Sequence, residues 1–593
     1  MMEVFCRVAV LSTVFIPMTI SERILNEPTL DSYDYIVVGG GTAGSVLASR
    51  LSEDPVSVLL LEAGGSELDN PLIDVPLMTT SLQFSEQDWQ YFTVPQTNSS
   101  LSLTKKQGYW PVGKVLGGSS STHYMVHIRG SPHDYDEWAA EGCDGWSYND
   151  VLPYFKKSED VQIPEYKDKA YRSTGGPITV TSNPTADSQL ISVYQQSALE
   201  KGWAITDCSG PNITGFCPTQ NDVRAGTRCS TAKAYIRPAL NRNNLQVSIN
   251  SHVTKIKIEN NRAVGVVFMK DGKIKTVAAT KEIILSAGAI GSAQLLMLSG
   301  VGPREHLEEL KIDVKKDLPV GNNLKDHLLI VMSYKLNVSW AVNQDKLNNA
   351  EEQEKYILNK KGIYSGTGCD ALLFAQTGKE SHDRGSPDVE VHFFSSAPEE
   401  EQLRNGLDQN IKNELLDKMV ADASSTGIRF LPVYLHPKSQ GTIRLKSKDP
   451  FDYPALDPNY LAHQDDVDGF VRAARVVQKI ASSTAMQKIG AILIPRVYEG
   501  FCDDVEFDSD DYWRCYTKNL ASSAFHYSCT CRMGSANDPT AVVDPQLRVK
   551  GILGLRVADA SVMRDIVSGN THTPVVMIAE KAADMIRGRT TIG

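Results

Sequence analysis

The chain has 593 residues, of which 41% are apolar and 22% are charged, and its formal net charge is −11. A chain of this length exceeds what one hydrophobic core usually serves, so two or more globular domains are expected. The negative charge, with no basic stripe along the sequence, argues against nucleic acid as a partner.

The N-terminal residues form the one stretch with a targeting pattern. Residues 8–20 are a mostly apolar run behind Arg7, and Ser21 completes a small-residue cleavage pattern. The run is shorter than the roughly 20 residues that cross a bilayer, so residues 1–21 are predicted to be a signal peptide. Secretion is favoured over retention as a membrane anchor or import into an organelle, and no other segment is expected to span a membrane. Three N-glycosylation sequons agree with a secretory route; they begin at Asn98, Asn212 and Asn337.

The chain has 10 cysteines, and loss of Cys6 with the leader would leave an odd number. Cys502 and Cys515 enclose a short acidic and aromatic loop, and we predict a disulfide between them. The alternative is two free thiols, as is common in a reducing compartment.

A strand, a glycine-rich turn and a helix open the first folded unit. The apolar strand at residues 34–38 leads into Gly-Gly-Gly-Thr-Ala-Gly at 39–44, and a helical run and a second strand, 56–61, follow. The glycines allow a tight turn, close approach of a pyrophosphate and packing of helix on strand, while the helix N-terminus attracts phosphates. Glu62 follows at close to the spacing expected for the acidic residue that binds the ribose. The residues expected at the dinucleotide are Gly39, Gly41, Thr42, Ala43, Gly44 and Glu62. This pattern alone does not separate NAD from FAD.

Five further motifs follow in order along the chain. They read GKVLGGSSS at 113–121, SAGAIGS at 286–292, LPVGNNLKDH at 318–327, VADASVM at 557–563 and SGNTH at 568–572. From about Tyr33 to Arg587 the set resembles the glucose-methanol-choline (GMC) oxidoreductases. Residues 511–515, Asp-Tyr-Trp-Arg-Cys, look most like the animal glucose-dehydrogenase-like and choline-dehydrogenase-like branch.

The resemblance implies FAD as the cofactor and an α/β fold. A Rossmann-like FAD-binding domain would be built from discontinuous segments, beside an α+β substrate-binding domain with an antiparallel sheet. Residues 31–329 would be mainly FAD-binding and 330–525 mainly substrate-binding, with a short strand at 441–445, and 526–590 would return to the FAD domain with the catalytic motifs. By the same resemblance, Gly117, Gly118 and Ser119 lie against the pyrophosphate and flavin, Val253 meets the adenine, and Asp559 lies by the ribityl chain.

Some positions depart from the family pattern. Val112 replaces a frequent Arg, Ala293 and Arg564 each replace a usual Pro, and His123 stands where most relatives have Asn. Of these, Arg564 and His123 are expected to alter the flavin's surroundings. Some relatives attach FAD covalently through a His one position earlier, where this chain has Thr122. Non-covalent FAD is therefore predicted, with His123 as a hydrogen-bonding replacement for Asn; covalent attachment through His123 is the alternative.

Oxidation of an alcohol removes a hydride from carbon and a proton from the hydroxyl. By the resemblance, the hydride goes to flavin N5 and a histidine handles the proton, which suits a side chain whose ordinary pKa is about 6.5. The motif Phe-His-Tyr-Ser-Cys-Thr-Cys-Arg-Met-Gly at 525–534 assigns this role to His526, with His572 as its partner at the substrate oxygen. The alternative is that His572 only packs against the flavin. Two coupled histidines would titrate as a pair.

The electron acceptor is predicted to be O₂ or a quinone, and the motifs do not decide between them. Secretion favours O₂, because O₂ is available there without a membrane partner. A protonated His526 or His572 could stabilise superoxide, and hydrogen peroxide is then expected from a small primary or aromatic alcohol. No metal site is predicted, and the acidic run 398–402 is interpreted as a surface loop. Two other functions stay open: lyase or photodecarboxylase activity of an FAD-containing relative, and a secreted FAD-binding protein without turnover.

Overall fold

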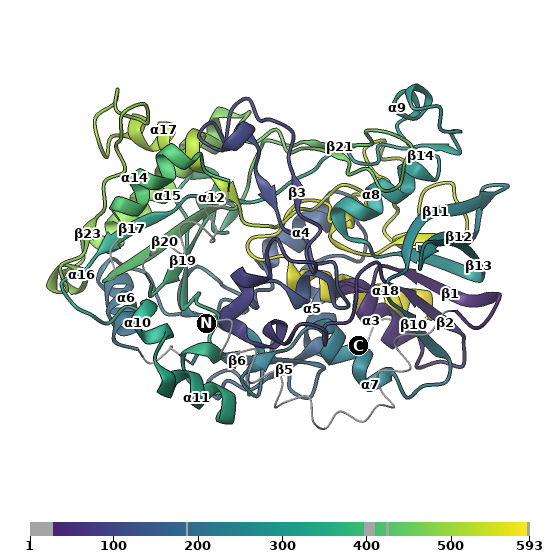
Figure 1. The fold of residues 1–593 in the computed structure, drawn as a ribbon, viewed down its shortest axis with the longest axis horizontal. Helices are drawn as coiled ribbons and strands as arrows, with labels where there is room; N and C mark the ends of the chain where they lie inside the picture. The colour runs from purple at the N-terminus through teal and green to yellow at the C-terminus, as the bar shows by residue number, and fades with distance from the viewer. Residues whose placement is uncertain (1–27, 185–187, 397–409, 423–425, 590–593) are drawn as a thin grey trace.

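A computed structural model describes residues 28–184, 188–396, 410–422 and 426–589 (Figure 1). The predicted leader, 1–21, and the acidic run 398–402 lie outside these residues. Two sheets carry the fold, and Figure 1 shows them at opposite ends of the molecule, with segments of the first 150 residues between them.

The first sheet is mainly parallel and holds the predicted nucleotide-binding unit. Its strand order is β10-β2-β1-β13-β12-β11, and β25 also pairs with β13. The strands are β1 (Ser32–Val38), β2 (Val58–Leu61), β10 (Leu245–Ser248), β11 (His252–Glu259), β12 (Arg262–Lys270), β13 (Lys273–Leu285) and β25 (Leu555–Val557). All four residues of β2, Val-Leu-Leu-Leu, are buried, as expected for a parallel strand covered on both faces.

Strand β25 comes from near the C-terminus, yet it pairs in parallel with the end of β13, Leu555 beside Ile283. The sheet is therefore assembled from distant segments of the chain.

The first crossover helix is α3 (Thr42–Leu51), which begins directly after the glycine turn. A Cβ on Gly44 would lie 1.8 Å from the carbonyl oxygen of Gly39, so only glycine lets the helix start this close to the strand. The C-terminal helix α18 (His572–Ile586) packs against α3, and α5 (Tyr148–Ser158) packs against α18.

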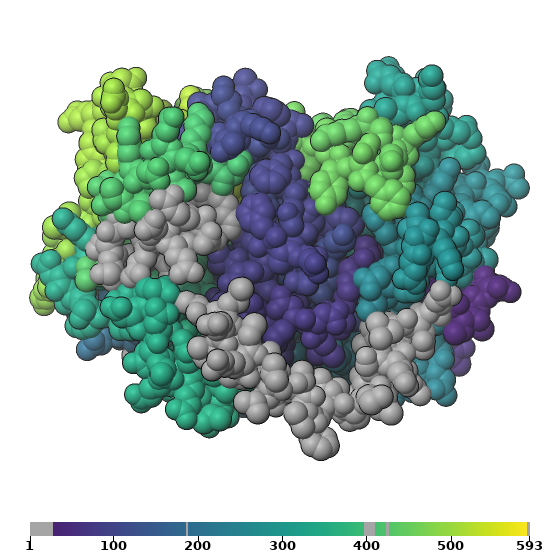
Figure 2. Space-filling view, in the orientation of Figure 1, coloured from purple at the N-terminus to yellow at the C-terminus, as the bar shows by residue number. Residues whose placement is uncertain are grey.

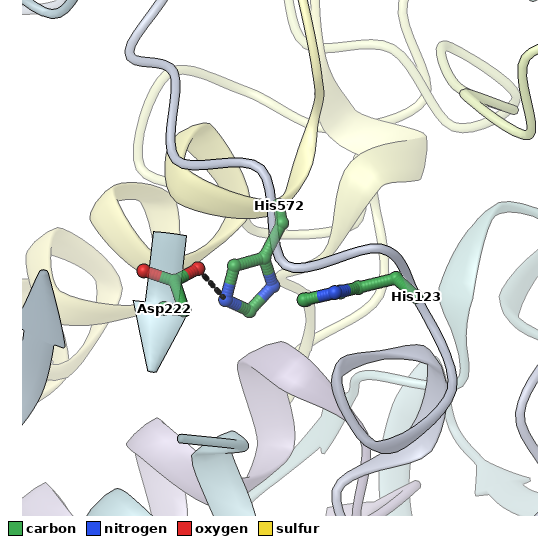
Figure 3. Close-up of side chains that lie close together, drawn as sticks. All are labelled: His123, Asp222 and His572. Atoms are coloured by element: carbon green, nitrogen blue, oxygen red, sulfur yellow. Dashed lines mark ion pairs between the residues drawn. The ribbon is translucent and has the colours of Figure 1, made fainter. Parts of the chain in front are cut away.

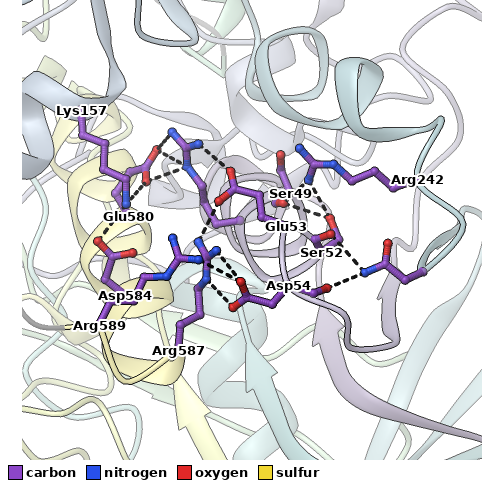
Figure 4. A network of polar contacts seen from close by, with 12 residues as sticks. Ser49, Ser52, Glu53, Asp54, Lys157, Arg242, Glu580, Asp584, Arg587 and Arg589 are labelled. Atoms are coloured by element: carbon purple, nitrogen blue, oxygen red, sulfur yellow. Dashed lines mark hydrogen bonds and ion pairs between the residues drawn. The ribbon is translucent and has the colours of Figure 1, made fainter.

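An ion-pair network fastens α18 to this first unit (Figure 4). Arg50 at the end of α3 binds Glu580 at 2.8 Å, and Arg587 binds Asp54 at 2.8 Å. From α5, Lys157 reaches Asp584 at 2.8 Å. Because Glu580 is fully buried and held on two sides, the network fixes α18, and with it the start of that helix at His572.

The second sheet is antiparallel, with the order β23-β17-β20-β19-β18-β7, and β16 pairs with both β20 and β24. The strands are β7 (Gly215–Pro218), β16 (Leu328–Leu329), β17 (Met332–Lys335), β18 (Ala371–Ala375), β19 (Val389–Phe394), β20 (Gly427–Tyr434), β23 (Ile492–Leu493) and β24 (Ser522–Ser523). Helix α15 (Gln464–Ala481) packs on β19 and β20. The predicted α/β class with a second, antiparallel sheet is confirmed.

Two details differ from the expected segmentation. β7 belongs to the antiparallel sheet although it lies inside the 31–329 segment, because it pairs with β18. The strand expected at 441–445 is β21 (Thr442–Arg444), which pairs with β22 (Ala455–Asp457) in a sheet of its own. The segment boundaries remain a prediction.

The disulfide predicted between Cys502 and Cys515 is present. A second one joins Cys208 to Cys217 of β7, and no sequence signal had indicated it. Within the described ranges, no helix has both the length and the apolar character needed to cross a membrane.

Candidate active site

A cavity of about 460 Å³ is lined by the ends of β1, β2 and β11 of the parallel sheet and by residues 524–527 and 570–572, among others. Figure 2 shows the segment with the short elements η1 (Pro71–Asp74), η2 (Pro76–Leu82), β3 (Tyr91–Phe92) and β4 (Tyr109–Trp110) along the middle of one face, between the parts that carry the sheets. Most of the predicted site residues line the cavity: Gly39, Gly41, Thr42, Ala43, Glu62, Gly118, Ser119, His123, Val253, His526, Asp559 and His572.

The other two predicted residues support the wall from behind. Gly44 packs beneath the start of α3, as described above. Gly117 has a positive φ of 91° and donates its backbone N–H to the carbonyl of Gly40 at 2.7 Å. This bond joins the two glycine-rich loops.

The two loops approach each other closely through their backbones. A Cβ on Gly118 would lie 2.6 Å from the Cα of Gly41, and a Cβ on Gly39 would lie 2.6 Å from the carbonyl oxygen of Ser286. A Cβ on Gly41 would meet only Gly118, at 3.7 Å. The Gly41 backbone therefore faces open space in front of the α3 N-terminus, which is the position where a helix attracts a phosphate group.

Glu62 ends β2 with its carboxylate held by two backbone donors. The N–H groups of Gly40 and Gly64 each donate to it at 2.7 Å. Burial raises the pKa of this carboxyl to about 7, although both hydrogen bonds oppose the shift. Such a buried acid in a cavity wall suits recognition of sugar hydroxyls.

Asp559 lies in the part of the cavity wall that borders α8 (Gly288–Leu298). It accepts hydrogen bonds from Ser292 Oγ at 2.6 Å and from the N–H of Gly288 at 3.0 Å, both from α8. Burial raises its pKa. Val253, in β11, pairs with Phe268 of β12 and borders the cavity beyond Glu62.

His526 belongs to a chain of hydrogen bonds that fixes its tautomer. Its Nδ1 lies 2.9 Å from Nδ1 of His327, whose Nε2 lies 2.9 Å from the carbonyl oxygen of Leu435. A carbonyl only accepts, so Nε2 of His327 carries hydrogen and donates to it. In neutral His327 the Nδ1 atom is then an acceptor, and Nδ1–H of His526 donates to it. Nε2 of neutral His526 is therefore left as a free base.

Both histidines are neutral in this arrangement. Burial, followed by the charges of His327 and His392, lowers the pKa of His526 well below its ordinary value. Burial also lowers the pKa of His327 to about 4. The backbone N–H of His526 donates to Asp326 Oδ1 at 2.8 Å, which fixes the loop that carries the imidazole.

Nε2 of His526 accepts a hydrogen bond from the amide of Asn570, with Nδ2 at 3.1 Å. Asn570 also lines the cavity. Asn570, His327 and Asp326 were not predicted as site residues, although the first lies in the motif at 568–572 and the others end the motif at 318–327.

His572 takes a different place from the one expected. It is the first residue of α18, and Figure 3 shows its ring between Asp222 and His123. Nε2 lies 3.4 Å from a carboxylate oxygen of Asp222, Nδ1 lies 3.4 Å from Thr42 Oγ1, and the His123 ring centroid is 4.4 Å away. Burial lowers the pKa of His572 to about 4, against the opposing charge of Asp222.

His123, Asp222 and His572 offer donor atoms within 4.8 Å of one another, a grouping that can hold a metal ion. The sequence had indicated no metal site, because these residues come from distant segments. The ring of His572 stands between the other two groups in Figure 3, so the three do not face one common point. In addition, one oxygen of Asp222 is already bound to His127 Nδ1 at 2.8 Å.

Residues 33–329 match the N-terminal region of the family described as GMC oxidoreductase, and residues 437–579 match its C-terminal region. The chain belongs to the GMC oxidoreductases. Glucose dehydrogenase [FAD, quinone] of Drosophila melanogaster is 38% identical over 96% of this chain and 88% of its own length. Mitochondrial choline dehydrogenase of Mus musculus is 38% identical over 95% of this chain and 90% of its own length. The solved structure of pyridoxine 4-oxidase from Mesorbium loti is 26% identical with a TM-score of 0.78, and covers 94% of this chain and 99% of that one.

As a GMC oxidoreductase, the chain is an enzyme that acts on CH–OH donors with FAD as its cofactor. The cavity fits this cofactor. The glycine backbone in front of α3 leaves open space for a pyrophosphate, and the carboxylate of Glu62 lies in the wall beside it.

The departures from the GMC pattern affect this site unequally. Arg564 binds Glu141 at 2.7 Å and also pairs with Asp538, so these acids, rather than the cavity, hold its guanidinium. Val112 and Thr122 line the cavity. His123 uses Nδ1 to accept the N–H of Met125 at 2.7 Å, and its buried Nε2 has no hydrogen-bond partner among the described residues.

Proposed function

We propose that this GMC oxidoreductase oxidises an alcohol with Nε2 of His526 as the base that takes the hydroxyl proton. The observation that carries the proposal is the hydrogen-bond chain from Leu435 through His327 to His526, which leaves Nε2 of His526 unprotonated. When bound, FAD supplies the hydride acceptor. Gly41, Glu62, Gly118, Ser119, Val253 and Asp559 are the residues that would hold it.

Asn570 is the proposed partner of His526. Its amide nitrogen lies 3.1 Å from the base and can donate to the oxygen of the substrate hydroxyl as the proton leaves. The lowered pKa of His526 supports the same role, because a base must be unprotonated before it can accept. The sequence had assigned the partner position to His572.

For His572 we propose a place beside the flavin, together with His123. Its contacts with Thr42 at the start of α3 and with the ring of His123 support this. Asp222 orients the ring, and His127, Asp222 and His572 form one buried row. Non-covalent FAD remains the proposal, because Thr122 stands at the linking position.

A quinone or similar organic acceptor is proposed in preference to O₂. The oxygen hypothesis required a protonated histidine near the cavity. Burial lowers the pKa of His123, His526 and His572, so none holds a proton of its own near pH 7, and His526 readily releases the one that it takes from the substrate. A relative at 38% identity carries quinone in its name, which supports the same choice.

The secretory route stays a proposal that rests on the leader and the sequons. Asn98, Asn212 and Asn337 are exposed, as glycosylation requires. Expression in a secretory host, followed by a loss of mass on enzymatic deglycosylation, would test it.

Anaerobic mixing with a panel of alcohols tests the proposed function. Bleaching of the flavin absorbance by an alcohol supports it. A yellow protein that no alcohol bleaches would instead support lyase, photodecarboxylase or purely FAD-binding function.

A further inference from the structure

The side chain of Asn570, the proposed partner of His526, has a single hydrogen bond. Its Nδ2 donates to Nε2 of His526 at 3.1 Å. Its Oδ1 is buried and makes no hydrogen bond within the part of the chain that the structure describes. One contact does not fix both the position and the rotation of an amide. The placement of Asn570 therefore depends on the backbone in front of it, residues 567–569.

This backbone lies against the segment that leads into helix α4 (Pro132–Ala140). A Cβ on Gly569, whose φ is +130°, would lie 2.7 Å from Cγ2 of Ile128. A Cβ on Gly130 would lie 3.2 Å from Cβ of Val567. Glycine at both positions lets the two segments come this close, so each fixes the path of the other.

Asp134, in the first turn of α4, joins the same backbone through two hydrogen bonds. Its carboxylate accepts from the backbone N–H of Ser568 at 2.6 Å and from Oγ of Ser568 at 2.7 Å. The carboxylate also accepts from the N–H of Ser131 at 2.8 Å, which completes the capping box of the helix. Asp134 and Ser568 are both buried.

The carboxylate of Asp134 does more than cap its helix. A capping box needs only the bond to Ser131, whereas the two bonds to Ser568 reach a segment 434 residues away in sequence. Burial raises the pKa of Asp134 to about 6, against the three donors, so the group is ionised near pH 7 and accepts from all of them. Charge-assisted hydrogen bonds of this kind are stronger than neutral ones.

A second residue of α4 binds the same part of the chain. Nε1–H of Trp138 donates to the carbonyl oxygen of Asp565 at 3.2 Å. Asp134 and Trp138 are four residues apart, so they project from one face of the helix. This face therefore holds the chain at two points, Asp565 and Ser568, shortly before Asn570.

We propose that Asp134 is a positioning residue for the oxidation: through Ser568 it holds the backbone that places the amide of Asn570 against Nε2 of His526. This inference rests on the proposed role of Asn570. Asp134 does not line the cavity, so its effect on the reaction is through the position of Asn570.

The test measures anaerobic flavin reduction with the alcohol that bleaches the holoenzyme fastest, and obtains the limiting rate and the dissociation constant separately. Asp134→Ala should lower the limiting rate roughly 10- to 100-fold and leave the dissociation constant within about twofold, because a small displacement of a reacting group acts on the rate. Asp134→Asn can still accept from the N–H of Ser568 and donate to its hydroxyl, so it should recover part of the rate. Ser568→Ala, which removes one of the two bonds, should lie between Asp134→Ala and wild type.

A double-mutant cycle separates positioning from a general loss of structure. If Asp134 acts through Asn570, Asp134→Ala should slow the Asn570→Ala variant by no more than about twofold. Losses that add would overturn the proposal, and so would wild-type rates in both Asp134→Ala and Ser568→Ala. If Asp134→Ala does not fold, Ser568→Ala takes its place in the cycle. Asp136→Ala, an exposed position of the same helix, is the matched control and should react like wild type.

A wild-type rate in Asn570→Ala would show that the proposed role of Asn570 fails, and the crystal structure of Asp134→Ala then judges Asp134 independently of activity. The proposal requires Nδ2 of Asn570 to move out of hydrogen-bond range of Nε2 of His526. If the two atoms remain 3.1 Å apart, as in the wild type, Asp134 does not position the amide and the proposal is overturned.

Discussion

His327 and His526 are 199 residues apart in sequence, and their Nδ1 atoms lie 2.9 Å apart. Because His327 gives its Nε2 hydrogen to the carbonyl of Leu435, it can only accept from His526. One backbone carbonyl thereby sets which nitrogen of His526 is unprotonated in the cavity. The tautomer of a catalytic histidine is commonly set by the partner of its second nitrogen.

His327→Ala should lower the rate of flavin reduction, because the imidazole of His526 loses the acceptor that orients it. Because His327 acts by positioning the imidazole of His526, His327→Asn, which retains a side-chain acceptor, should recover part of the rate. Single-turnover mixing measures both. The exposed His463→Ala serves as the control, and equal rates in all three variants would mean that His327 only packs.

His526→Ala should retain FAD and lose about 10²- to 10⁴-fold in the rate of flavin reduction, the usual contribution of general acid–base catalysis. In wild type the rate should stay level from pH 8 down to about 6.5 and fall only in more acidic solution. The sign follows from the lowered pKa of His526, since the neutral base persists below the ordinary pKa of about 6.5 and is lost as the pH falls through the lowered value. A rate that already declines between pH 8 and 7 would contradict this.

Asn570→Ala should slow flavin reduction more than His572→Ala, because Asn570 is the residue that contacts the base. The main effect of His572→Ala should be a change in flavin absorbance or reduction potential, since His572 contacts Thr42, Asp222 and His123. The reverse ranking in single-turnover rates would restore His572 as the partner.

Gly41→Asp should abolish FAD loading, because it places a carboxylate in front of the α3 N-terminus where the pyrophosphate binds. Gly41→Ala is the matched control. Its Cβ would meet Gly118 at an ordinary 3.7 Å, so the fold should tolerate it and much of the flavin should remain. The ratio of flavin absorbance to protein absorbance measures both, and full occupancy in the Asp variant would remove Gly41 from the site.

Reoxidation by air should take many minutes after reduction by an alcohol, whereas an artificial quinone should restore the oxidised spectrum within seconds. Burial lowers the pKa of the three cavity histidines, so none keeps a positive charge for oxygen near pH 7 once His526 has released the substrate proton. Rapid formation of hydrogen peroxide in air would identify an oxidase instead.

Several features were predictable because neighbouring residues define them. The glycine turn at 39–44 permits only a tight strand-to-helix connection, and β1 and α3 flank it as expected. Glu62, at the end of β2, borders the cavity. Cys502 and Cys515 enclose a loop short enough to be joined, and they are joined. In each case the residues lie close together in sequence, so a local pattern contains most of the information.

The tertiary structure decided what depends on distant segments or on the direction of a side chain. Asn570 and His572 are two residues apart, yet one precedes α18 and the other begins it, so one side chain meets His526 and the other meets Asp222. The bond between His327 and His526 exists because β16, which directly follows the motif at 318–327, pairs with β24 just before His526, Leu328 beside Ser523. Glu390 reads in the sequence as one acid in an apolar strand; only the packing of β18 and β20 around it shows that it is buried without a hydrogen-bond donor among the described residues. A sequence motif identifies the chemistry that a segment can supply, whereas the direction of each side chain is set by the segments that pack against it.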